Sequence, residues 1–75
     1  MCLSIPMQIV NINGLTALCT AKGVNRSVSL FLLQDTPLVE GDYVMVHVGY
    51  ALERISLEDA QVTWALLDDM VSADA

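Results

Sequence analysis

Positively charged and aromatic side chains are the scarcest features of this 75-residue sequence. It carries three Lys and Arg residues against nine Asp and Glu residues, which gives a formal net charge of −6. Nucleic-acid binding depends on a cluster of cations that neutralises phosphates, and three cations are too few to form one. With one Phe, one Trp and two Tyr, the chain also has few surfaces on which a sugar could stack. We therefore expect no nucleic-acid partner.

An uninterrupted apolar run is also missing. The first charged residue is Lys22, yet polar residues, Pro6 and Gly14 interrupt the segment before it. A signal peptide needs a basic start followed by an unbroken apolar stretch, and a membrane-spanning helix needs about 20 apolar residues. We therefore expect a cytoplasmic protein with no membrane association.

Cysteine is limited to Cys2 and Cys19, and the sequence contains no Cys-x-x-Cys pair. A secreted domain of this size usually carries two or more disulfides. We expect two free thiols and no self-contained zinc site. Cys19 lies between Leu18 and Thr20 in an apolar segment and is expected to be a buried core residue.

Apolar residues, by contrast, are abundant at 55% of the chain. A single domain spanning residues 1–75 is the only realistic organisation at this length. So short a chain cannot bury all of these side chains. The remainder either forms a contiguous docking patch or is scattered over the surface, and composition does not decide between the two.

The first half of the chain predicts three short strands. Met7–Ile12 and Leu15–Thr20 flank Asn13-Gly14, which predicts a type I′ hairpin turn. After Gly23, apolar residues alternate with polar ones, with Val24, Val28, Leu30 and Leu32 on the expected inward face. Arg26 interrupts this face, and it is expected either at a strand end or paired with a carboxylate.

Two further strands and a helix are expected in the second half. In Tyr43–Val48 the alternating valines predict the core face, and Tyr50–Ile55 follows Gly49. From Ser56 the period becomes helical, with Ser56 and Asp59 forming a weak capping box. We predict a mainly β fold, a five-stranded OB-like barrel over about residues 5–55, with a C-terminal helix over about 57–71.

No complete catalytic constellation is visible, and we expect a protein that is not an enzyme. Cys2 is the most distinctive candidate, because a thiolate is a soft ligand for iron, zinc or copper(I). One thiolate cannot hold a metal alone, so a partner would supply further ligands. The single histidine, His47, lies opposite the valine face and is either a surface residue or a group close to a metal at Cys2. A thiol enzyme using Cys2 with His47 and a generic OB-like module for a small ligand stay open as alternatives.

Four stretches give the sequence a resemblance to a known family. Met1–Pro6 resembles an opening of Met-Cys, two variable residues, an apolar residue and Pro, and three other stretches agree in order and spacing. They are Gly23-Val24-Asn25-Arg26, Gly41-Asp42-Tyr43-Val44 and Val46-His47-Val48-Gly49-Tyr50-Ala51. Together they resemble the HypC, HupF and HybG family of maturation chaperones for nickel–iron (NiFe) hydrogenases.

This resemblance implies a function that composition does not reach. It implies a chaperone that binds the HypD scaffold protein and the precursor of the hydrogenase large subunit. The cargo would be iron carrying cyanide and carbon monoxide ligands, held transiently and shared with the scaffold. Cys2 would be the shared iron ligand and His47 a residue close to the iron. The expected partner-binding residues are Cys2, Pro6, Tyr43, Met45 and His47.

Overall fold

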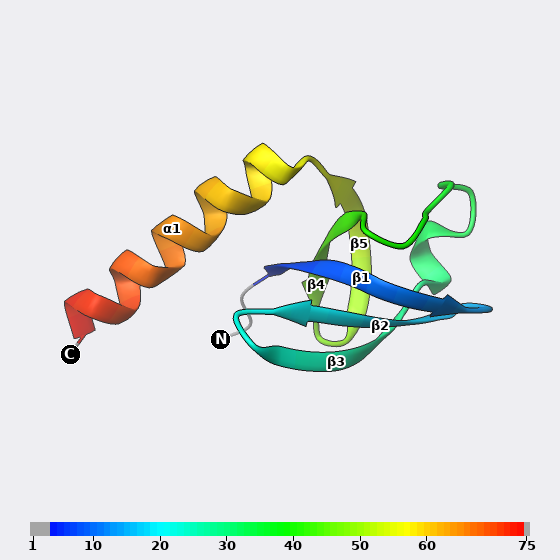
Figure 1. Cartoon of the computed structure of the whole chain (residues 1–75), viewed down its shortest axis with the longest axis horizontal. Coiled ribbons are helices and arrows are strands. Elements are labelled where there is room, and N and C mark those ends of the chain that lie inside the picture. The colour runs from blue at the N-terminus through cyan, green and yellow to red at the C-terminus, as the bar shows by residue number, and fades with distance from the viewer. Residues whose placement is uncertain (1–3, 75) are drawn as a thin grey trace.

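A closed five-stranded barrel with one C-terminal helix forms the fold, which confirms the mainly β architecture expected from the sequence (Figure 1). The computed structural model describes the backbone of residues 4–74 and the side chains of residues 4–68. Around the barrel the strands follow the order β1-β2-β3-β5-β4. The elements are β1 (Ile5–Asn13), β2 (Thr16–Ala21), β3 (Val24–Ser29), η1 (Phe31–Leu33), β4 (Tyr43–His47), β5 (Tyr50–Ile55) and α1 (Leu57–Asp74).

Strand β1 is shared between two neighbours and so curves the sheet into a barrel. Its first residues pair with β4, from Ile5 opposite Val46 to Gln8 opposite Tyr43. From Gln8 onward it pairs with β2, and the register shifts between Ile9 and Asn11. An extra residue of this kind bends a strand and increases its twist, which lets one strand serve both neighbours.

The seam between β3 and β5 is the weakest part of the barrel. These strands are parallel and pair at one position, Ser29 opposite Tyr50. The amide of Ser29 also donates a 2.8 Å hydrogen bond to the carbonyl oxygen of Gly49. Because pairing begins only at the end of β3, the first half of that strand has β2 as its one neighbouring strand among the described residues. The barrel is therefore open at this end.

The core confirms the valine face of β4 and corrects the expected inward face of β3. Val44 and Val46 are buried, as the alternation in β4 predicts. On β3, Val28 and the following Leu30 are buried, but Val24 and Leu32 are exposed. Val24 lies at the open end of the barrel, and Leu32 belongs to η1, whose helical geometry ends the two-residue alternation. The inward phase predicted over Val24–Leu32 is therefore correct only in its middle.

The β1–β2 turn also differs from the prediction. Its two central residues are Gly14 and Leu15, because Asn13 pairs with Thr16. Gly14 has a φ of 65°, and Asn13 belongs to the strand. Positive φ at the first central position alone is typical of a type II′ turn, whereas type I′ needs it at both. The hairpin is confirmed, and its type I′ assignment is wrong.

Two other hairpins have the φ angles of a type I′ turn. Lys22 and Gly23 join β2 to β3 with φ angles of 53° and 81°. Val48 and Gly49 join β4 to β5 with φ angles of 52° and 81°. A β-branched residue at positive φ is a genuine outlier, so Val48 is held in an unfavourable backbone conformation.

Helix α1 starts at a side-chain cap and then runs past the start of β1. The Asp59 amide donates a 3.0 Å hydrogen bond to Ser56 Oγ, which satisfies one free amide of the first turn. Figure 1 shows α1 leaving the end of β5 and passing the side of the barrel where the β2–β3 turn lies. The helix continues to Asp74, three residues beyond its expected end.

Candidate functional site

A pocket of about 380 Å³ lies between α1 and the open end of the barrel. We call it the mouth pocket. Its apolar lining comes from four strands, the β4–β5 turn and the helix: Ile5, Met7, Ala21, Val24, Val46, Val48, Trp64 and Leu67. Three charged residues, Lys22, Arg26 and Asp68, complete its rim. Because Ile5 begins β1, the chain enters the barrel at the edge of this pocket.

The open seam explains why Arg26 lies in the apolar phase of β3. Arg26 pairs with Cys19, and residues directly opposite each other in a sheet lie on the same face. Cys19 is fully buried on the inward face, so Arg26 shares that face. At the open end of the barrel this face borders the mouth pocket, and Arg26 is exposed.

Neither expectation for Arg26 holds. It lies within β3 rather than at a strand end. Among the side chains that the structure describes, the one ion pair joins Lys22 to Asp68, so Arg26 has no carboxylate partner there. In the sequence, Arg26 was noticeable because it breaks the alternation of apolar and polar residues. That break does not reveal that Arg26 lies beside a pocket.

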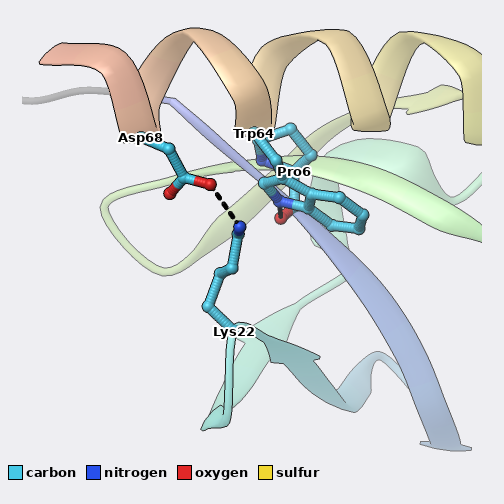
Figure 2. A network of polar contacts seen from close by, with 4 residues as sticks. All are labelled: Pro6, Lys22, Trp64 and Asp68. Carbon is cyan, nitrogen blue, oxygen red and sulfur yellow. Dashed lines mark hydrogen bonds and ion pairs between the residues drawn. The ribbon is translucent and has the colours of Figure 1, made fainter. Parts of the chain in front are cut away.

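Two polar contacts hold the helix against the barrel around the mouth pocket (Figure 2). The Trp64 indole Nε1 donates a 2.8 Å hydrogen bond to the Pro6 carbonyl oxygen. Lys22 Nζ lies 2.6 Å from Asp68 Oδ2, and both side chains are more than half exposed. The sequence did not single out either contact, since each joins segments far apart in the chain.

Pro6 and Tyr43 are in contact with the helix. Pro6 is buried, and its carbonyl accepts the bond from Trp64. The ring of Tyr43 meets the Trp64 ring edge-on, with 5.8 Å between the centroids. Met45 lies opposite Pro6 and is half-buried. The partner-binding role expected for these residues stays a prediction.

His47 lies at the end of β4, close to the start of the described chain. Since Ile5 is opposite Val46 in an antiparallel pair, His47 is at the level of Ser4. The imidazole is half-buried, and its Nδ1 is buried without a hydrogen-bond partner among the described residues. An unpaired buried nitrogen costs free energy. This atom is therefore suited to a hydrogen bond from outside the described residues.

The two cysteines differ in what the structure describes. Cys2 lies outside the described residues, three positions before Ile5. Cys19 is a free thiol with no exposed surface, as expected for a core residue. Burial raises the pKa of the Cys19 thiol above its ordinary value. Cys19 is thus an apolar packing residue and a poor nucleophile.

Exposed apolar side chains gather outside the barrel as well. On α1, Val62 and Leu66 are 60% and 59% exposed and lie one turn apart on the same face. On η1, Phe31 and Leu32 are similarly exposed. Elsewhere on α1, Ala60 is buried and Trp64 half-buried, whereas Leu57 is exposed.

Within the described part of the chain, no group of three or more His, Cys, Asp or Glu residues is placed to hold a metal ion. No helix in that part is both long and apolar enough to cross a membrane.

Comparisons with known proteins match almost the whole chain. The model of the HupF/HypC family matches residues 1–67. The hydrogenase maturation factor HypC of Rhizobium leguminosarum bv. viciae is 42% identical over 76 residues, which cover 100% of this chain and 99% of that relative. HypC of Cupriavidus necator is 39% identical, over 93% of this chain and 77% of that relative. The hydrogenase expression/formation protein HupF of Bradyrhizobium diazoefficiens is 37% identical, over 97% of this chain and 72% of that relative.

Proposed function

Because this chain belongs to the HupF/HypC family, we propose that it is a cytoplasmic chaperone of hydrogenase maturation. It binds the HypD scaffold protein and the precursor of the hydrogenase large subunit in turn. Through Cys2 it helps to assemble and deliver the iron that carries cyanide and carbon monoxide. The observation that carries this proposal is the family match, which extends over the Met1-Cys2 opening and the whole barrel.

The chemistry of Cys2 suits transfer rather than storage. A thiolate is a soft ligand that binds iron well, but structural metal sites are usually closed by four protein ligands. A single thiolate from this chain, together with ligands from the scaffold, leaves the iron group exchangeable. The protein then acts by binding and handing over its cargo, and no covalent catalysis is needed.

The residues near the N-terminus support a role in partner binding for His47 and its neighbours. His47 is at the level of Ser4, two residues from Cys2, and its buried Nδ1 has no hydrogen-bond partner among the described residues. Pro6 fixes the backbone direction at the start of β1, and Trp64 holds its carbonyl. In this proposal Pro6, Tyr43, Met45 and His47 belong, with Cys2, to the partner-binding face.

The test is affinity purification of the tagged protein from cells that make a hydrogenase, followed by infrared spectroscopy. We expect cyanide and carbon monoxide bands, with the scaffold and the precursor in the purified sample. Cys2→Ala is expected to remove the bands and hydrogenase activity while leaving the melting temperature unchanged. Cys19→Ala is the matched control and is expected to keep the infrared bands and the hydrogenase activity.

Two outcomes would contradict this function. One is full iron loading and hydrogenase maturation in the Cys2→Ala variant. The other is a small ligand that raises the melting temperature equally in the wild-type and Cys2→Ala proteins, with no partner protein retained. The second result would favour a generic OB-like binding module.

A further inference from the structure

The mouth pocket is within reach of a group held at Cys2. Ile5 borders the pocket, and the three residue steps from position 2 to position 5 span at most about 10 Å. A thiolate at Cys2 and an atom bound to it can therefore reach the rim of the pocket. Arg26 and an apolar wall are available there.

We propose that the mouth pocket receives the cyanide and carbon monoxide ligands of the iron group, and that Arg26 donates hydrogen bonds to a cyanide nitrogen. This inference rests on the proposed function and adds a site that recognises the cargo by its small ligands. Cys2 binds the metal, and Arg26 acts as a positioning residue for the group.

The two kinds of ligand need different surroundings, and the pocket supplies both. Iron-bound cyanide carries negative charge, and its nitrogen has a lone pair that accepts hydrogen bonds. A guanidinium offers five donors in a fixed plane, and hydrogen bonds from an ionised donor are stronger than neutral ones. Bound carbon monoxide is a weak acceptor, which suits the apolar wall of Val46, Val48 and Leu67.

Arg26 is the cation best placed for this role. Lys22 also lies at the rim but is engaged by Asp68 at 2.6 Å. Arg54 borders a different pocket, beside Tyr43 and Leu57. The formal charge of −6 disfavours binding of an anionic group over most of the surface. Arg26, a cation beside an apolar pocket, is a place where an anionic group can bind.

Arg26→Gln tests this inference, with Arg26→Lys as the charge-conserving variant and Arg54→Gln as the matched control. Each protein is purified from hydrogenase-producing cells as its complex with the scaffold, and infrared bands are recorded per mole of protein. We expect Arg26→Gln to keep the scaffold but to retain the iron group about tenfold less well. Its cyanide bands should shift more than its carbon monoxide band. Arg26→Lys should retain the group with shifted cyanide bands, and Arg54→Gln should match the wild type.

The results separate this inference from the proposed function. If Arg26→Gln keeps unshifted bands and full retention while Cys2→Ala loses the bands, the role of Arg26 is overturned and the chaperone function stands. If Arg26→Gln loses the scaffold itself, Arg26 binds a carboxylate of the partner, which also overturns the inference. Absence of the bands from the wild-type complex overturns both. Because Arg26 is exposed, unchanged melting temperatures are expected throughout.

Discussion

The indole nitrogen of Trp64 lies 2.8 Å from the carbonyl oxygen of Pro6 and donates a hydrogen bond to it. This bond joins the middle of α1 to the second residue of β1, 58 positions away in the chain. The helix and the point where the N-terminal segment enters the barrel are therefore held as one unit. A change in the helix position would therefore be transmitted to the start of β1.

Replacing Trp64 with Phe tests this coupling. The variant keeps an aromatic ring against Tyr43 but removes the donor, so we expect a loss of about 1 kcal/mol in the free energy of unfolding. Urea denaturation followed by circular dichroism measures it. Leu66→Ala is the control on the same helix, since Leu66 is exposed, and it should change stability by less than about 0.5 kcal/mol. Equal losses in the two variants would show that the bond does not anchor the helix.

Relief of the unfavourable backbone at Val48 should stabilise the protein. Val48 has a φ of 52° and is 68% exposed. Asn tolerates this conformation, and Asn-Gly is the preferred type I′ pair, so Val48→Asn should raise the free energy of unfolding by about 1 kcal/mol. Val39→Asn, at an exposed position whose φ is not positive, should bring no such gain. An unchanged or lower stability for Val48→Asn would contradict this reading of the turn.

The Cys19 thiol should make stability depend on alkaline pH. Burial raises its pKa in the folded state above the ordinary value of 9.0. Above that value the unfolded chain releases the thiol proton while the folded chain retains it, so unfolding is favoured as pH rises. The contribution is fully present below about pH 9 and is lost as pH rises through the folded-state pKa. Urea unfolding at about pH 8 and pH 10 should show a larger loss in wild type than in Cys19→Ala. Equal losses of stability in the wild type and in Cys19→Ala would contradict a contribution from the Cys19 thiol.

The Lys22–Asp68 ion pair should contribute little and should be sensitive to salt. Both side chains are more than half exposed, and exposed pairs contribute about 0.2–1 kcal/mol. We expect Asp68→Asn to lower the free energy of unfolding within that range at low ionic strength. The difference should vanish near 1 M salt, where the screening length is about 3 Å. A loss that persists at high salt would mean that Asp68 does more than pair with Lys22.

Local patterns predicted the elements of this fold well. The valines of β4 and the helical period after Ser56 each follow from a face that packs against the rest of the protein. Such faces are visible in the sequence as a periodic spacing of apolar residues. The predicted turn type was wrong because Asn13-Gly14 is compatible with two strand registers. Which register forms depends on the pairing along the whole of β1. The predicted environments of Val24 and Arg26 were wrong for another reason. Their face is inward by alternation but opens to a pocket because β5 does not extend beside them.

The candidate site was less accessible to sequence reasoning. Cys2, His47 and Pro6 could be singled out by residue type and position. The mouth pocket depends on where α1 packs, which the Trp64–Pro6 and Lys22–Asp68 contacts decide. Contacts between residues 58 and 46 positions apart leave no periodic trace in the chain.

The single pairing position between β3 and β5 makes this barrel a sheet rolled into a cylinder and fastened at one point. In the first half of β3, the backbone amides that point away from β2 have no neighbouring strand to bind within residues 4–74. These amides should exchange their protons with solvent sooner than those of β1 and β4. Val24 and Arg26 also line the mouth pocket, so hydrogen exchange along Val24–Ser27 should slow when a ligand occupies that pocket.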